Sequence, residues 1–292
     1  MMRTFTILFI ILTIFIIHSC KRQTGQDYGP VVSASIIPLE YFVDRLTDKA
    51  LEVNVMIPPG ASHATYSPTT SQFRKLSGSG IYFRIEHLGY EKAWINRLSE
   101  MNPHMRVLNL MQGMDLIRGE EIDHGDHVHE GGVDPHIWMS PAVILKILPK
   151  MRDAIVEVYP ELYETVEHNY LKLTEEIELL DQEMRETVES LSNKRFMIFH
   201  PALTYLARDY GLEQIAVERG GKEPSPAMLS HIIREARTYD IPVIFIQREF
   251  DVRSADLISR ETGAEIVQIN PLAYNWDENI RELIDIFKTR LH

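Results

Sequence analysis

Residues 161–191, ELYETVEHNYLKLTEEIELLDQEMRETVESL, contain neither proline nor glycine and are rich in glutamate, leucine and lysine. Steps of three and four residues separate the apolar side chains at Leu162, Val166, Tyr170, Leu173, Ile177, Leu180, Met184 and Val188. This spacing is typical of an amphipathic helix, which would be roughly 45 Å long at about 1.5 Å per residue. We therefore predict one long helix; the alternative is two ordinary helices with a break that the sequence does not mark.

Short apolar runs typical of β-strands lie on both sides of this segment. Four precede it and four follow it: VVSASII (31–37), LEVNVMI (51–57), GIYFRI (80–85), RVLNL (106–110), RFMIFH (195–200), QIAVE (214–218), PVIFIQ (242–247) and AEIVQIN (264–270). Helical stretches such as PTTSQFRKLS and SPAMLSHIIREARTY alternate with them. Such alternation favours α/β layers on mainly parallel sheets. We predict an N-terminal α/β lobe over 30–160 and a C-terminal α/β lobe over 192–292, joined by the rigid helix at 161–191.

The composition is that of a globular protein with a full-sized core. The chain has 292 residues, of which 45% are hydrophobic and 25% charged, enough for one large domain or two ordinary ones. Its formal net charge of −12 argues against nucleic-acid binding, which needs concentrated positive charge. The same charge is compatible with the gathering of cations.

The N-terminus has the features of a secretory signal. Arg3 precedes the apolar run FTILFIILTIFII, which is too short to span a bilayer comfortably. Cys20, the sole cysteine, follows directly and resembles the lipidated cysteine of bacterial lipoproteins, although His18 is unusual there. We predict a lipoprotein signal peptide at 1–20 and a polar tether at 21–29. The alternative is a plain signal peptide with an accidental cysteine.

Three histidines stand where a strand runs into a helix or a rigid loop. His63 lies in PPGASHATYSP, His136 lies in DPHIWMSP between Pro135 and Pro141, and His200 ends the run RFMIFH. Ligands bind to α/β sheets at the carboxyl ends of strands, and imidazoles are ordinary zinc ligands. Each histidine alone would more often be structural, but three in such loops predict a shared metal site. With one cysteine in the chain, a thiolate site of several cysteines is excluded, as is an internal disulfide.

A second group of histidines lies in DHGDHVHEGG, which has little strand or helix character and several acids. His124, His127 and His129 belong to this group. We interpret residues 123–130 as a flexible, weaker collecting site that raises the local zinc concentration. The alternative is a solvated polar loop that binds metal only incidentally.

The residues around these histidines resemble the zinc/manganese family of periplasmic substrate-binding proteins of ABC transporters. DPHIWMSP and FHPALTYLARDYGL match two of its ligand motifs, VNVMIPPGASHATYSPTTSQ resembles its first ligand loop, and YEKAW is similar to its Glu-x-x-Trp segment. GGKEPSPAML and FDVRSADLISRETGAEIVQINPL resemble its C-terminal landmarks. The likeness covers nearly all of the mature sequence. It implies two lobes, a connecting helix and a metal in the interlobe cleft. It also implies an inner-membrane permease with a cytoplasmic ATPase as partner.

Two positions depart from the pattern of that family. Its first histidine usually falls one position later, where this sequence has Ala64, so that His63 occupies the preceding place. Its fourth ligand position is commonly an aspartate before Pro-Leu and is Asn270 here. The fourth ligand is therefore Asn270, water or a nearby carboxylate such as Glu86 or Glu249.

The ligand types point to Zn²⁺ as the metal. Three imidazoles suit Zn²⁺, whereas Mn²⁺ favours more carboxylate oxygen, and manganese relatives tend to have an acid where His200 stands. We predict an extracytoplasmic zinc receptor that is a lipid-anchored monomer rather than an enzyme. A manganese receptor or an adhesin of the same fold is one alternative. A zinc hydrolase is another, since three histidines and an open position also activate water, but the chain has no HExxH pair.

The remaining candidate side chains call for plainer interpretations. We expect Trp94 and Trp138 to pack the N-terminal lobe rather than to contact the ligand, because the ligand is an ion. Surface or packing positions are expected for His87, His104, His168 and His231.

Overall fold

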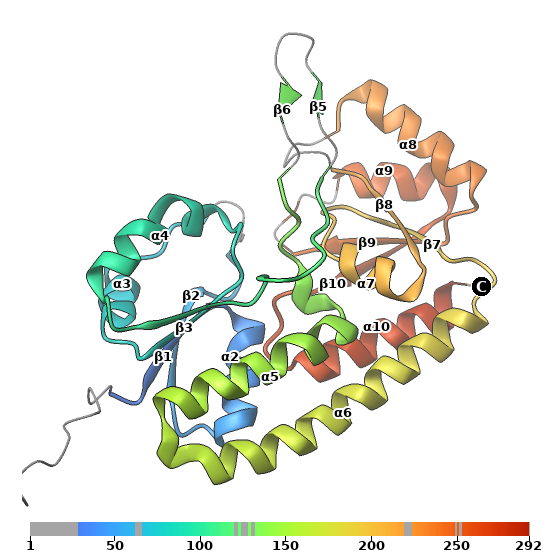
Figure 1. Ribbon diagram of the computed structural model, residues 1–292. Coiled ribbons are helices and arrows are strands. Elements are labelled where there is room, and N and C mark those ends of the chain that lie inside the picture. Colours follow the sequence, from blue (N-terminus) through green and yellow to red (C-terminus); the bar gives the residue numbers. More distant parts are fainter. Residues whose placement is uncertain are drawn as a thin grey trace, which may run out of the picture.

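The computed structural model describes residues 29–61, 66–119, 122–123, 128–129, 132–218, 224–248, 250 and 253–291. The predicted signal sequence, Cys20 and nearly all of the predicted tether lie outside these residues. Within the described residues, no helix combines the length and the apolar character needed to cross a membrane. The described chain forms two α/β halves, each built on its own sheet (Figure 1).

The first sheet has four parallel strands in the order β2-β1-β3-β4. The strands are β1 (Val31–Ile36), β2 (Glu52–Ile57), β3 (Ile81–Arg84) and β4 (Arg106–Asn109). The helices between them are α2 (Ile37–Thr47), α3 (Thr70–Ser77) and α4 (Gly89–Met101). Each of the four apolar runs predicted before the long helix contains one of these strands.

The second sheet also has four parallel strands, in the order β10-β9-β7-β8. The strands are β7 (Arg195–Ile198), β8 (Glu213–Ala216), β9 (Val243–Gln247) and β10 (Glu265–Ile269). The helices that alternate with them are α7 (Thr204–Tyr210), α8 (Pro226–Thr238) and α9 (Arg253–Thr262). The predicted fold class, two α/β lobes with mainly parallel sheets, is confirmed.

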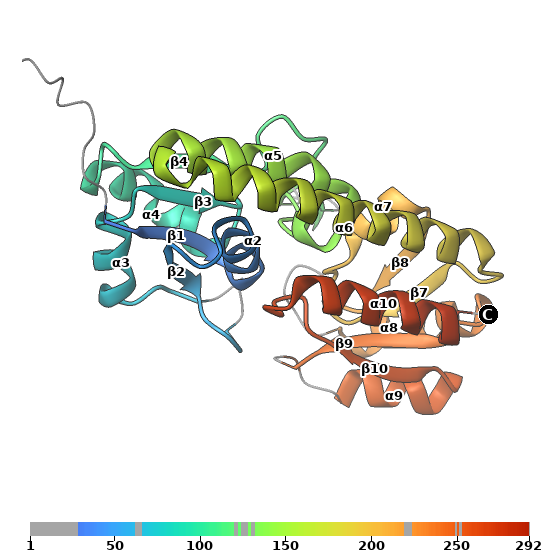
Figure 2. The same ribbon diagram turned by 90° about the horizontal axis from the view of Figure 1, so that it is seen from below.

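One long helix, α6 (Tyr163–Ser190), runs along both halves of the molecule (Figures 1 and 2). It packs against α2, against α5 (Pro141–Val158) and against α10 (Trp276–Arg290). The stripe that it buries is the predicted one and includes Val166, Leu173, Ile177, Leu180, Met184 and Val188. The single unbroken helix expected from the apolar spacing is therefore present, and a short 3-10 turn, η2 (Pro160–Leu162), precedes it.

The two halves share a continuous apolar core at a tryptophan pair. Trp138, in the short 3-10 helix η1 (Ile137–Met139), donates its indole N–H to the carbonyl of Pro271 at 2.8 Å. Trp276 at the start of α10 donates in return to the carbonyl of Trp138 at 2.7 Å, and its ring lies 5.1 Å from that of Phe42. Both indoles are fully buried. Trp138 packs in the core as expected, and its hydrogen bonds also cross to the segment that begins α10.

The chain between β4 and η1 forms a two-stranded ribbon that projects beyond the sheets (Figure 1). Strands β5 (Ile122–Asp123) and β6 (Val128–His129) pair antiparallel, and a bridge between Arg118 and Val133 lies nearer the base. The expectation of little strand character in this segment is therefore wrong for its described residues. Their backbone groups pair across the ribbon, which a glycine-rich and charged sequence did not indicate.

Candidate metal centre

His136 is buried, and its own sequence motif holds it. The carboxylate of Asp134 accepts from the backbone N–H of His136 and contacts its ring Nδ1, both at 2.8 Å. The imidazole is only 3% exposed. A carboxylate can only accept, so Nδ1 carries the proton and Nε2 carries the lone pair that could bind a metal.

Burial alone would raise the pKa of the Asp134 carboxyl, but the adjacent His136 outweighs it. The positive charge that the His136 ring carries when it is protonated, together with two hydrogen bonds from His136, holds the pKa of Asp134 below the usual range. The group therefore remains anionic although it is largely buried.

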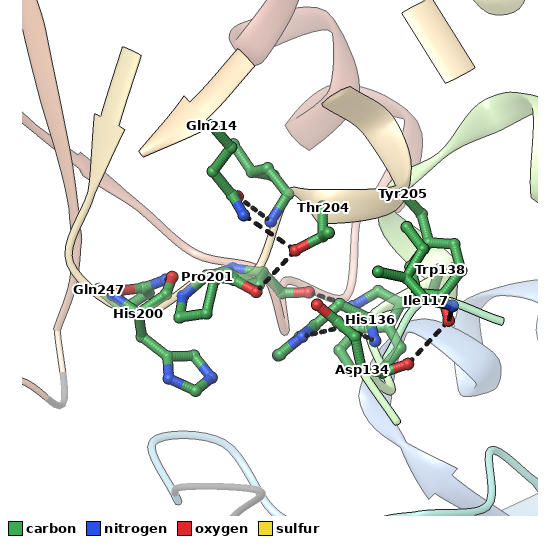
Figure 3. A network of polar contacts seen from close by, with 12 residues as sticks. Ile117, Asp134, His136, Trp138, His200, Pro201, Thr204, Tyr205, Gln214 and Gln247 are labelled. Atoms are coloured by element: carbon green, nitrogen blue, oxygen red, sulfur yellow. Dashed lines mark hydrogen bonds and ion pairs between the residues drawn. The ribbon is translucent and has the colours of Figure 1, made fainter. Parts of the chain in front are cut away.

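His200 sits where the carboxyl ends of three neighbouring strands meet. It follows β7, and its Nδ1 lies 3.2 Å from the carboxylate of the buried Glu218, just beyond β8. At the end of β9, Gln247 donates to the His200 carbonyl at 2.8 Å and accepts from its N–H at 3.4 Å (Figure 3). Phe250 stacks on the imidazole with the ring centroids 5.2 Å apart. The backbone and the ring of His200 are thus both positioned, and Nε2 again faces away from the carboxylate.

The two imidazoles come together although 63 residues separate them along the chain. Their ring centroids are 5.2 Å apart, with an interplanar angle of 73°, and Nε2 is buried in each ring. A zinc–nitrogen bond of about 2.0–2.1 Å places the ion about 3.2 Å from the ring centroid, so two ligands at the tetrahedral angle have centroids about 5 Å apart. The observed spacing is compatible with two ligands of one zinc ion.

The third predicted ligand, His63, lies outside the described residues, as does the neighbouring Ala64. The described residues before and after His63 both hydrogen-bond the side chain of Gln72 in α3, which was not predicted from the sequence.

The amide of Gln72 uses both of its ends. Its Nε2 donates to the carbonyls of Val55 and Met56, at 2.8 and 3.0 Å, at the end of β2. Its Oε1 accepts from the hydroxyl of Tyr66 at 2.9 Å and from the N–H of Thr69 at 2.8 Å. Thr69 is the N-cap of α3, and its side chain accepts from the N–H of Gln72 in a capping box. The pattern Thr-x-x-Gln, which marks such a box, was the signal that could have identified this residue.

Asn270, the predicted fourth ligand, follows β10 and is exposed. Its side-chain oxygen accepts from the backbone N–H of Leu272 at 3.1 Å and so caps a turn. Of the two alternative carboxylates, Glu86 is bonded by the amide of Asn109 and lies 3.5 Å from Arg84, and Glu249 lies outside the described residues.

In the part of the chain that the structure describes, no group of three or more histidine, cysteine, aspartate or glutamate side chains gathers as a metal site. The described residues therefore bring together two of the four predicted ligands, His136 and His200. Of the predicted collecting loop, His124 and His127 lie outside the described residues, and the backbone of His129 pairs opposite Ile122 in the ribbon.

The carboxylates behind the two imidazoles were not predicted. Asp134 stands two residues before His136, inside the motif DPH, where its spacing could have indicated a contact. Glu218 lies at the end of a different strand from His200. Glu218 comes near His200 only because β7 pairs with β8, and no spacing along the chain predicts that pairing.

Comparison with known proteins gives a consistent result. Residues 32–290 match the model of the family described as zinc-uptake complex component A, periplasmic. The chain is 25% identical over 290 residues to the zinc-binding lipoprotein AdcA of Streptococcus pneumoniae, covering 96% of this chain and 57% of the relative. It is 26% identical over 303 residues to the high-affinity zinc uptake system protein ZnuA of Bacillus subtilis, covering 97% of this chain and 94% of that protein.

A crystal structure of ZnuA superposes on this fold with a TM-score of 0.81 and 29% identity, covering 90% of this chain and 99% of that one. The chain spans only a little over half the length of the AdcA relative.

Proposed function

The chain belongs to the family of periplasmic zinc-uptake complex component A proteins, and from this premise we propose that it captures Zn²⁺ outside the cytoplasm and delivers it to an ABC permease. The observation that carries the proposal is a pair of imidazoles, the buried His136 and the partly buried His200, each held through Nδ1 by a carboxylate. Zn²⁺ is the cargo of this site, so it must be bound and then released.

The charges around the pair suit a dehydrated divalent cation. Neutral imidazoles bring no charge, so the two positive charges of Zn²⁺ need compensation once water is lost. The carboxylates of Asp134 and Glu218 lie directly behind the rings and provide that compensation without occupying the ion's own coordination sites. They also select the tautomer in which Nε2 can bind the metal.

We propose His63 as the third ligand and Asn270 or water as the fourth. In this arrangement His63 belongs to the N-terminal lobe at 30–160, and His200 belongs to the C-terminal lobe at 192–292. The ion is then shared between the lobes. A ligand set dominated by imidazole favours Zn²⁺ over Mn²⁺, because Mn²⁺ prefers carboxylate oxygen.

The setting of the receptor is part of the same proposal. Cys20 would carry a lipid, and residues 21–29 would tether a monomeric receptor to the membrane near a permease driven by a cytoplasmic ATPase. Substitution of Cys20 by Ser should move the protein from the membrane fraction to the soluble fraction, and retention in the membrane would contradict the anchor.

The histidines of the ribbon would serve as a collecting site for scarce zinc. Deletion of residues 123–130 should lower the number of weakly bound zinc ions and slow uptake when zinc is scarce. Unchanged stoichiometry together with unchanged uptake would remove this role.

The direct test is a calorimetric titration of metal-free protein lacking residues 1–20, with elemental analysis of the protein as purified. We expect one tightly bound Zn²⁺ per chain and weaker binding of Mn²⁺. Tighter binding of Mn²⁺ would favour the manganese alternative, and no binding of either metal would overturn the receptor. Hydrolysis of ester or peptide substrates by the zinc-loaded protein would favour the hydrolase alternative.

A further inference from the structure

The segment that carries His136 and the helix that follows His200 are joined by one hydroxyl group. Tyr205 in α7 is 1% exposed, and its hydroxyl donates to the carbonyl of Asp134 at 2.9 Å. The same hydroxyl accepts from the backbone N–H of Ile117 at 3.2 Å. Asp134 is the residue whose carboxylate holds the ring of His136. The hydroxyl of Tyr205 therefore bonds the backbone of the residue whose side chain orients the imidazole of His136 (Figure 3).

The other end of Tyr205 is attached firmly to His200. Between them, the N–H of Ala202 donates to the carbonyl of His200 at 2.8 Å. The hydroxyl of Thr204 donates to the carbonyl of Pro201 at 3.3 Å and accepts from the amide of Gln214 at 2.8 Å (Figure 3). That amide also accepts from the N–H of Leu203 at 2.9 Å. The turn from His200 to Tyr205 is thus closed by hydrogen bonds within itself and to the side chain of Gln214.

We propose that Tyr205 is a positioning residue that sets the spacing of the imidazoles of His136 and His200. This inference rests on the proposed function. The link runs from His200 through the closed turn to the Tyr205 hydroxyl, and then through Asp134 to His136. Without the hydroxyl, the carbonyl of Asp134 and the N–H of Ile117 lose their partner, and the loop that holds His136 can shift relative to α7. Because one metal ion must reach both imidazoles, a change in the distance between the rings of His136 and His200 should weaken metal binding.

The chain offers a matched control in the same helix. Tyr210 is 8% exposed, and its hydroxyl accepts from the N–H of Ala142 at 3.2 Å and donates to the carboxylate of Asp181 at 2.6 Å. These bonds tie α7 to α5 and α6, away from both imidazoles. Tyr205→Phe and Tyr210→Phe each remove one oxygen and two hydrogen bonds, so a general loss of stability should affect both variants alike.

The experiment measures zinc affinity and the visible absorption of bound Co²⁺ in the full chain, purified in detergent, for the wild type and both variants. The d–d bands of Co²⁺ report coordination geometry, which a purely structural residue would not change. We expect Tyr205→Phe to bind Zn²⁺ about fivefold to tenfold more weakly and to alter the Co²⁺ spectrum. Tyr210→Phe should keep both wild-type values, and the two metal-free variants should melt at similar temperatures.

Tyr205→Phe with the affinity and the Co²⁺ spectrum of Tyr210→Phe would overturn the inference while leaving the receptor intact. A wild type that binds no zinc would instead overturn the proposed function itself. If Tyr205→Phe does not fold, Thr204→Val takes its place, because the Thr204 hydroxyl closes the turn on Pro201 and its side chain also hydrogen-bonds the carboxyl of Asp134. An unchanged Co²⁺ spectrum in that variant would also contradict the positioning role.

Discussion

Two largely buried carboxyl groups, in different regions of the molecule, have pKa values that shift in opposite directions. The pKa of Asp134 beside His136 is lowered, whereas burial raises the pKa of Glu91, in the N-terminal half at the start of α4. Both lose their hydration on folding. Asp134 faces an imidazole, while Glu91 accepts mainly from the hydroxyls of Ser35 and Tyr82, with Arg84 lying 3.9 Å away.

The difference shows that the partners of a carboxyl decide whether its pKa rises or falls when burial acts on both groups in the same direction. Neutral hydroxyl donors only partly offset the loss of hydration, so the carboxylate of Glu91 is destabilised in its charged form. Asp134, in contrast, contacts the imidazole of His136, which can carry a positive charge. An acid with such a partner is suited to a site that receives a cation. Changes in the two regions should accordingly affect different properties: metal affinity in one and the pH dependence of stability in the other.

The largest effect should come from removal of a ligand. His136→Ala or His200→Ala should abolish the thermal shift that zinc causes in the wild type, because binding to the folded state alone stabilises it by about 2.7 kcal/mol at a hundredfold excess over Kd. Differential scanning calorimetry with and without zinc measures this. His168→Ala, at an exposed position of α6, is the control and should keep the shift. A full shift in either ligand variant would remove that residue from the site.

A smaller loss is expected when a ring loses its carboxylate. Glu218→Gln should weaken zinc binding by about 10-fold to 100-fold, because the neutral amide neither selects the tautomer of His200 nor balances the charge of the ion. Isothermal titration gives the affinity. Glu213→Gln serves as the control, since Glu213 begins β8, the strand that Glu218 follows, and forms an exposed ion pair with Arg195. Equal affinities for the two variants would show that Glu218 has no role in binding.

Gln72→Leu extends the comparison to the first sheet and to the described residues that flank His63. It leaves the carbonyls of Val55 and Met56 without their side-chain donor, which should cost about 1–3 kcal/mol of stability. If His63 is a ligand, zinc affinity should also fall, by about threefold to tenfold. Urea unfolding and zinc titration separate the two effects, with the exposed Ser71→Ala in the same helix as control. Lower stability with unchanged zinc affinity would count against His63.

The smallest effect concerns the pH dependence of stability and comes from Glu91. A carboxyl whose pKa is higher in the folded state binds its proton better when folded, so folding is favoured at low pH. That advantage is lost as pH rises from about 4.5 through the raised pKa of Glu91. Glu91→Gln keeps the shape without the charge and should melt about 2–4 °C higher than the wild type at pH 7. The gap should close towards pH 4, and a gap independent of pH would contradict the assignment.

The elements could be predicted because their signals are local. The apolar spacing along α6 and the β-branched runs such as VIFIQ in β9 depend only on neighbours in the chain. His136 and His200 could be proposed as ligands for the same reason, since His200 ends a recognisable strand and His136 lies in a short motif bracketed by prolines. The ribbon at β5 and β6 was missed because its sequence, rich in charge and glycine, resembles that of a loop.

Local patterns along the chain were therefore enough to predict the succession of strands and helices, the long amphipathic helix and the candidate ligands. Which of these groups meet depends on how the folded chain packs. Glu218 reaches His200 because β8 lies beside β7, Tyr205 reaches Asp134 because α7 packs against the segment of η1, and Trp138 joins the two halves through Pro271. Such contacts depend on the order of strands in a sheet and on how its layers pack. Residues far apart in the chain set both of these, and no periodicity within one segment encodes them.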